Sequence, residues 1–244
     1  MTTRLAALLV FLLGSSLLQA ETGNWQKEYD KLLQKYVADG GVRYAKWKAN
    51  TEDIAALQRV VTAIGNETPE RLDQKEQLAF YINAYNAWTV RLVLDKYPIR
   101  SIREHSPLFG IFTGKNIKVA GERMSLNHLE HQIIRKRFRD PRIHFAINCG
   151  SKSCPPLPPN AFSGEALDRQ LTQQTKAFTM NSLGVQYSPD GKRAKVSKIF
   201  KWYDEDFKRE GGTREFINKA RPNGLPADSK LEYQKYDWSL NEAK

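Results

Sequence analysis

The chain has 244 residues, 41% of them hydrophobic and 27% charged, and its formal net charge is +11. That share of apolar residues supports a folded core and excludes an intrinsically disordered chain. Scarce, scattered glycine, proline and cysteine exclude collagen-like, low-complexity and disulfide-dense scaffolds, and the single continuous apolar stretch, at the N-terminus, excludes a polytopic membrane protein.

The N-terminal segment has the organisation of a secretory signal. Arg4 supplies a positive charge, residues 6–18 are apolar apart from a Gly-Ser-Ser interruption, and Ala20 offers a small residue for cleavage. This apolar run is too short to cross a hydrocarbon core of about 30 Å. The sequence therefore predicts a signal peptide over residues 1–20, a single domain over residues 21–244, and a periplasmic or secreted protein with no stable membrane span after cleavage.

The positive net charge indicates which classes of molecule the protein could bind. A basic surface attracts anionic molecules at long range, and nucleic acid is the usual candidate at such a charge. An exported protein rarely meets nucleic acid, so we expect none as a partner. The alternatives are an unknown small-molecule or peptide substrate, anionic envelope material, or a charge that serves solubility alone, because the basic residues are spread along the whole chain.

Hydrophobic periodicity and turn residues predict the elements in chain order. Helices are expected over residues 25–37, 54–64, 68–97, 125–138, 164–179, 200–207 and 214–220. Short strands are expected at residues 117–119 and 124, over 142–148, on either side of the turn 188–191, and over 231–236, with a long loop over 99–116. This order predicts an α+β fold in one domain, with a helix-rich N-terminal half packed on a small mixed or antiparallel sheet.

Polar side chains stand in two apolar helical stripes. Asn83 lies in the stripe of the helix over residues 68–97, with Asn86 at its edge, and each amide either ties down a loop or points into a site. Glu130 falls on the inner stripe of the helix over 125–138, next to His131. A carboxylate there is half of a buried pair or a site residue.

The segment 142–156 carries both cysteines. As a regular strand it would place His144 on one face and Cys149 on the other, so the two could meet only if Gly150 bends the chain; otherwise His131 would approach from the preceding helix. A thiol before a Gly-Ser turn can be surrounded by free backbone N–H groups, here those of Gly150 and Ser151, which would lower its pKa and bind an oxyanion.

The cysteines allow four interpretations. A Cys149–Cys154 disulfide would enclose four residues and contribute only about 2 kcal/mol. Cys149 could instead be a free, activated nucleophile with a histidine and an acid or amide partner. Zinc bound by both cysteines with His131 or His144 matches no common spacing, so no metal and no cofactor is expected. The thiols could also be inert.

Five motifs together resemble the domain-of-unknown-function 547 family (DUF547). They are residues 76–87, Glu130-His131, residues 140–156, residues 199–203 with Phe207, and residues 236–241. The resemblance spans residues 42–241. It implies a stand-alone exported bacterial protein, and the same domain occurs in plant chains beside coiled-coil segments. It also implies that a residue like Cys149 recurs where Cys154 is replaced, which favours a free thiol over a shared disulfide.

Two functional hypotheses follow. In the first, the protein is a thiol-dependent hydrolase or acyl transferase: Cys149 is the nucleophile, His131 or His144 the base, Glu130 or Asn83 orients the imidazole, and the N–H groups of Gly150 and Ser151 stabilise the oxyanion. In the second, it is a non-catalytic periplasmic binding or scaffold domain with a Cys149–Cys154 disulfide, in which buried polar groups such as Asn86 hold a ligand or partner.

Overall fold

The structure, a computed structural model, describes residues 25–104 and 110–243. The predicted signal peptide over residues 1–20 lies outside this part. Residues 25–36 are helical. The α-helices that follow are α2 (Tyr44–Ala49), α3 (Thr51–Asn66), α4 (Gln74–Lys96), α5 (Gly110–Thr113), α6 (Leu126–His128), α7 (Arg135–Phe138), α8 (Leu167–Met180), α9 (Ile199–Trp202), α10 (Asp204–Lys208) and α11 (Thr213–Ala220). Two 3₁₀ helices, η1 (Pro69–Arg71) and η3 (Pro141–Phe145), and a π-helix, η2 (Leu129–Ile134), complete the helical set.

The strands form three small sheets. Two are antiparallel hairpins, β1 (Val37–Ala38) with β2 (Gly41–Val42) and β3 (Ile117–Val119) with β4 (Glu122–Met124). In the third, β6 (Arg193–Val196) pairs antiparallel with β5 (Val185–Tyr187) and parallel with β7 (Lys230–Tyr233). The fold class is therefore α+β with a small mixed sheet, as predicted. Among the residues described, no helix has both the length and the apolar content that crossing a bilayer requires.

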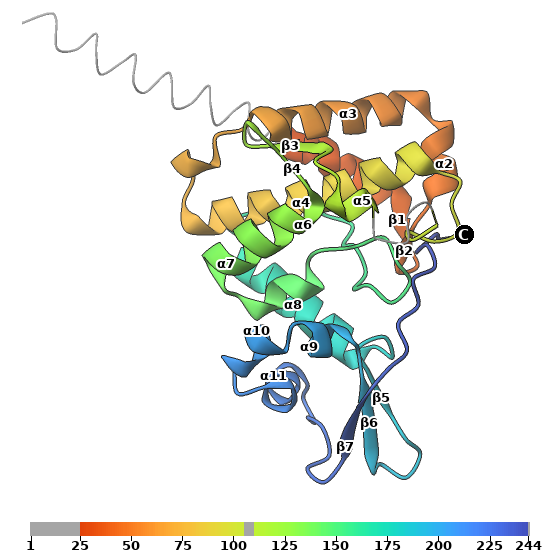
Figure 1. Cartoon of the computed structure of the whole chain (residues 1–244), viewed down its shortest axis with the longest axis vertical. Coiled ribbons are helices and arrows are strands. Elements are labelled where there is room, and N and C mark those ends of the chain that lie inside the picture. The colour runs from red at the N-terminus through yellow and green to blue at the C-terminus, as the bar shows by residue number, and fades with distance from the viewer. Residues whose placement is uncertain (1–24, 105–109, 244) are drawn as a thin grey trace, which may run out of the picture.

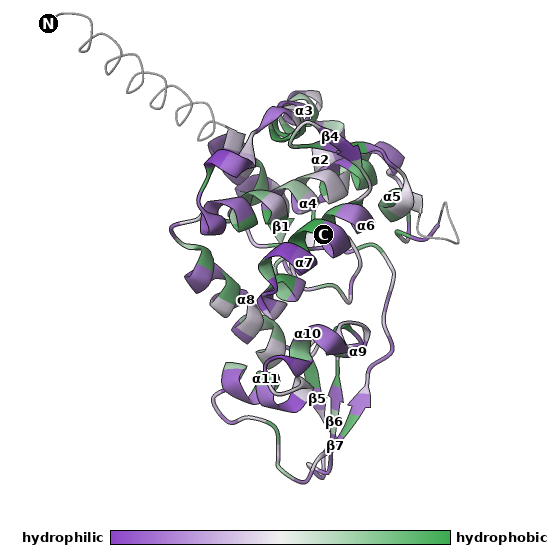
Figure 2. Ribbon diagram, turned by 60° about the vertical axis from the view of Figure 1, so that its left-hand side comes forward, coloured by the Kyte–Doolittle hydropathy of each residue, from purple (hydrophilic) through white to green (hydrophobic). Residues whose placement is uncertain are grey.

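The molecule has two parts joined by α8 (Figure 1). The upper part contains α2 to α7, and the lower part contains α9 to α11 beside the three-stranded sheet. After β7 the chain runs back along one edge to β2, where Val42 pairs with Glu242. Figure 2 shows that apolar residues line the faces where these elements meet.

Helix α4 is the centre of the upper part. Fourteen of its residues are buried, because α3, η2 and α8 pack around it and leave it little contact with solvent. Its start is fixed by a capping box, in which Asp73 accepts from the backbone of Glu76 and the Glu76 side chain accepts from the backbone of Asp73. The predicted start at Thr68-Pro69 was wrong: proline there begins η1, a separate 3₁₀ turn.

The predicted strand over residues 142–148 was also wrong, because residues 141–145 form the 3₁₀ helix η3. Asp140 accepts a hydrogen bond from the Arg142 backbone N–H at 2.9 Å, and Pro141 supplies the fixed φ of a first helical position. The alternation of residue types is misleading, because residues 143–148 are buried on both faces. His144 and Cys149 are therefore not held on opposite sides of a sheet.

Two amides on α4 hold the chain on either side of the cysteines. Asn83 donates to the carbonyl of Phe162 at 2.7 Å and accepts from its N–H at 2.9 Å. Asn86 donates to the Ala146 carbonyl and accepts from the Asn148 N–H, both at 2.8 Å. Because each amide satisfies two buried backbone groups, both act as ties between α4 and irregular segments.

We expect Asn86→Ala to lower the free energy of unfolding by about 2–4 kcal/mol, because it leaves one buried carbonyl and one buried N–H without partners. Urea unfolding followed by circular dichroism measures the change. Asn160→Ala, which removes an exposed amide bonded to Gln34, is the control and should change stability by less than about 0.5 kcal/mol. Equal effects of the two substitutions would contradict the assignment.

Candidate functional site

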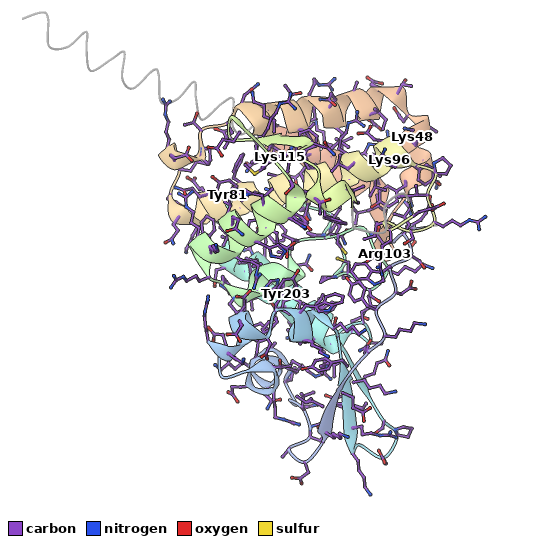
Figure 3. The ribbon with its side chains drawn as sticks, in the orientation of Figure 1. Lys48, Tyr81, Lys96, Arg103, Lys115 and Tyr203 are labelled. Atoms are coloured by element: carbon purple, nitrogen blue, oxygen red, sulfur yellow. The ribbon has the colours of Figure 1, made fainter. Side chains whose placement is uncertain are left out.

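A cavity of about 270 Å³ lies between the upper and lower parts of the molecule. Four of the candidate catalytic residues line it: Glu130 and His131 from η2, His144 from η3, and Cys149 from the loop that follows η3. An aromatic wall made of Trp202, Tyr203, Tyr236 and Trp238 also lines the cavity. Figure 3 shows Tyr203 at the junction of the two parts. The cavity thus unites segments that are far apart in sequence.

The thiol of Cys149 is half-buried and surrounded by hydroxyl groups. Its Sγ lies 3.1 Å from Ser151 Oγ and 3.5 Å from Tyr236 Oη. Burial raises the pKa of the thiol, but hydrogen bonds from Cys154, Ser151 and Tyr236 outweigh burial and lower it to about 7. A large fraction of Cys149 is therefore thiolate near neutral pH, which is the reactive form of the side chain.

The Cys149–Cys154 disulfide, one of the alternatives that the sequence left open, is absent: both cysteines are free thiols. The Cys149 backbone N–H donates to Cys154 Sγ at 2.8 Å. Burial, followed by the interaction with Cys149, raises the pKa of Cys154 well above its usual value. Cys154 thus stays protonated and stabilises the neighbouring thiolate.

His144 is oriented by a carboxylate that sequence reasoning missed. Its Nε2 lies 2.8 Å from Asp206 Oδ2, its ring stacks on Tyr203 with centroids 3.8 Å apart, and its Nδ1 has no hydrogen-bond partner among the described residues. Burial lowers the pKa of His144, although Asp206 opposes this. The pKa of Asp206 is far below its usual value, because hydrogen bonds from His144 and Arg135 outweigh its burial. We therefore assign neutral His144 a proton on Nε2 and a lone pair on Nδ1.

His131 has the opposite arrangement. Arg135 Nη1 lies 3.0 Å from His131 Nδ1, and Arg135 Nε donates to Asp206 Oδ2 at 2.7 Å. Arginine can only donate, so Nδ1 of His131 is an acceptor and the proton of the neutral ring sits on Nε2. In the part of the chain that the structure describes, Cys149 has no hydrogen bond to His131 or to His144.

Glu130 is buried and held by two phenols. Tyr203 Oη donates to Oε1 at 2.6 Å and Tyr85 Oη donates to Oε2 at 3.2 Å. Burial first, and then the charge of Glu130, raise the pKa of both tyrosines far above the usual range, so both remain neutral donors. Glu130 lies in η2, and π-helical turns of this kind are frequent at functional sites.

Comparison with protein families finds a match within the chain. Residues 69–179 match the family model described as "Protein of unknown function, DUF547". The chain contains a DUF547 domain. No curated protein and no solved structure matches it. The matched segment of the DUF547 domain includes Cys149, both cavity histidines and Glu130, whereas Asp206 and the aromatic wall lie beyond it.

Three predicted site residues of the DUF547 domain have other surroundings. Asn83 and Asn86 bond to backbone and do not line the cavity. The Gly150 N–H donates to Asn148 Oδ1 at 2.8 Å, so it is occupied; the positive φ of +80° at this position favours glycine. Ser151, in contrast, has its hydroxyl and its backbone N–H on the Cys149 sulfur.

Sequence reasoning missed Asp206 and the roles of the four wall residues. A signal for Asp206 was present, because Tyr203, Asp206 and Phe207 fall on one helical face, and an acid on an aromatic stripe is a buried polar group. Among the described residues of the DUF547 domain, no group of three His, Cys, Asp or Glu side chains is placed to hold a metal ion.

We expect the rate of alkylation of Cys149 by iodoacetamide to be half-maximal near pH 7, because the pKa of the thiol is lowered to about 7. Cys154→Ala should move this midpoint upward, since it removes one donor to the thiolate. Intact-mass measurements between about pH 5 and pH 10 give both profiles. A wild-type midpoint at the ordinary thiol value of about 8.5 would contradict the assignment.

We expect Asp206→Asn to lower the free energy of unfolding at neutral pH by about 1–3 kcal/mol, because Arg135 and His144 lose a charged partner. The folded-state pKa of Asp206 is depressed, so its contribution is present above about pH 4 and is lost as pH falls. The two unfolding curves should therefore converge in acid. Asp204→Asn, which removes an exposed partner of Lys208, should cost less than about 1 kcal/mol at every pH.

Proposed function

We propose that the DUF547 domain is a thiol-dependent hydrolase or acyl transferase with Cys149 as its nucleophile. The observation that carries the proposal is the lowered pKa of Cys149 in a cavity shared with the Asp206–His144 pair. Groups whose pKa values are shifted in a pocket are candidates for chemistry. A free thiol also favours this function over the disulfide-linked binding domain.

The first step needs no direct contact between thiol and imidazole. Hydrogen bonds from Cys154, Ser151 and Tyr236 already favour the thiolate, which attacks the carbonyl carbon of the substrate to form a thioester through a tetrahedral oxyanion. The backbone N–H of Ser151, which interacts with the Cys149 sulfur, is the oxyanion donor of this scheme. The N–H of Gly150, bonded to Asn148, is not used.

His144 is the general base of this scheme. Its Nδ1 carries a lone pair and no partner among the described residues, while Asp206 fixes the tautomer through Nε2. The leaving group of the first step takes its proton from solvent. His144 Nδ1 then takes a proton from the water or acceptor that attacks the thioester, the Cys149 thiolate is released as the tetrahedral intermediate collapses, and the imidazolium returns the proton to solvent. His131 has only its Nε2–H to offer a substrate, because Arg135 occupies its Nδ1. Asp206 thus takes the orienting role that sequence analysis gave to Glu130 or Asn83.

The proposal includes export to the periplasm or the exterior. It is supported by Arg4, the apolar run over residues 6–18 and the small residue Ala20. In an oxidising compartment, Cys149 and Cys154 would have to stay reduced for Cys149 to act as the nucleophile. Mass analysis of the protein from the host periplasm, with and without reductant, tests both points: cleavage after Ala20 and two alkylated thiols are expected.

We expect purified protein to form an acetyl adduct on Cys149 when treated with p-nitrophenyl acetate, with a burst of nitrophenol. Cys149→Ala should abolish the burst and the adduct. His144→Gln should slow turnover by about 10²-fold or more while the adduct accumulates, because hydrolysis of the thioester loses its base. His128→Gln, an exposed histidine outside the cavity, is the matched control and should behave as wild type. An undiminished burst in folded Cys149→Ala would refute the proposal.

A further inference from the structure

The proposed chemistry leaves one buried ionisable group without a role. Glu130 lines the cavity at 5% exposure, and its hydrogen-bond partners are the hydroxyls of Tyr85 and Tyr203. Among the described residues it has no ion pair with lysine or arginine; the nearest basic atom is His131 Nδ1, at 3.9 Å. That atom already accepts from Arg135.

Asp206, the other carboxylate of the site, differs from Glu130 in having a cationic partner. Asp206 is paired directly with Arg135 at 2.7 Å, so its charge is compensated within the protein. A buried carboxylate without a cation is costly, even when neutral donors satisfy part of its hydrogen-bonding capacity. Each oxygen of Glu130 receives one hydrogen bond from a tyrosine, and a carboxylate can accept about four. The remaining capacity and the uncompensated charge are both available to a ligand.

The wall around Glu130 is suited to a cation. The ring of Trp202 lies 4.7 Å from that of Tyr236 and 5.5 Å from that of Trp238, between centroids. Electron-rich faces of tryptophan and tyrosine attract ammonium groups. Two rings of the wall already bind cations of the protein itself. The guanidinium of Arg135 lies 4.8 Å from the ring centroid of Tyr203, and the guanidinium of Arg103 lies 5.2 Å from the ring centroid of Trp238.

We propose that this cavity recognises a cationic group on its substrate, a primary or quaternary ammonium, with Glu130 as the counter-charge and the aromatic wall as its surroundings. The inference rests on the proposed function, because it takes the Cys149 cavity as the substrate site. It adds the charge of the group that the substrate carries. A volume of about 270 Å³ suits a single side chain or head group. An ionised Cys149 adds to the negative charge, so an anionic group at this position is disfavoured although the chain as a whole is basic.

Three methanethiosulfonate reagents of similar size test the proposal: a trimethylammonium-ethyl, a sulfonato-ethyl and a neutral methyl compound. In each reaction the Cys149 thiolate attacks the sulfenyl sulfur, a disulfide forms and a sulfinate leaves. Rates for the charged reagents are divided by the neutral rate, which removes changes in access and ionisation. We expect the cationic reagent to react faster than the anionic one in wild type, and Glu130→Gln to reduce that ratio by about tenfold or more.

Glu205→Gln is the matched control, because it removes the same charge from an exposed position outside the cavity. Its ratio should stay within about twofold of wild type, since exposed charges are screened. A ratio unchanged by Glu130→Gln, or a faster anionic reagent, overturns the inference. If Glu130→Gln does not fold, the wild-type ratio is divided by the same ratio for free cysteine, whose thiolate alone favours the cationic reagent. A quotient above one supports the inference, because the net charge of +11 would by itself lower it, and a quotient of one or less overturns the inference.

A titration with tetramethylammonium chloride, followed by tryptophan fluorescence, provides a measurement independent of the thiol. Saturable binding that weakens about tenfold in Glu130→Gln supports the inference, and no saturable change in wild type refutes it. The two proposals fail separately. A reactive Cys149 without charge preference leaves the proposed function standing, whereas an unreactive thiol with tetramethylammonium binding leaves only the cation site.

Discussion

The site depends on how the buried backbone of one irregular loop is satisfied. Residues 146–155 have no regular ladder of their own, and buried N–H and carbonyl groups without partners are costly. The Asn86 side chain forms hydrogen bonds with two of these backbone groups from one side of the loop. On the other side the C-terminal segment supplies partners: the Asn241 N–H donates to the Gly150 carbonyl at 3.0 Å, and the Lys152 N–H donates to the Ser239 carbonyl at 2.8 Å. Folding of this loop, and with it the position of Cys149, therefore requires both α4 and the C-terminal segment.

The sequence predicted the elements whose signals are local. Capping residues, glycine stops and helical periodicity identified most helices, and the turn at 188–191 identified the β5–β6 hairpin. The strand predicted over 142–148 failed because alternation of residue types implies a sheet only when one face is exposed, and here both faces are buried. The π-helical turn at η2 could not be predicted, since its i→i+5 bonds depend on tertiary packing around Glu130.

For the site, the sequence indicated which ionisable groups and which thiol stand in unusual positions, but it did not indicate which residues they contact. Glu130, His131, His144 and Cys149 were named from their neighbours in the chain, and one cavity brings them together. Asp206 reaches His144 across 62 positions, a separation over which no periodicity operates. Tyr236 and Trp238 belong to a family-like motif whose sequence gave no indication of contact with the thiol. Pairing of this kind is a property of the tertiary fold.

The two carboxylates of the site show how environment separates their roles. Asp206 is paired with a permanent cation and hydrogen-bonded to His144, so it fixes an imidazole without adding net charge to the cavity. Glu130 accepts hydrogen bonds from neutral phenols, and its charge is available to a ligand that enters the cavity. If the two exchanged partners, His144 would lose its defined tautomer and the cavity its counter-charge. Arg135 forms an ion pair with Asp206 and not with Glu130, and it is therefore the residue that makes one acid a catalytic support and the other a recognition group.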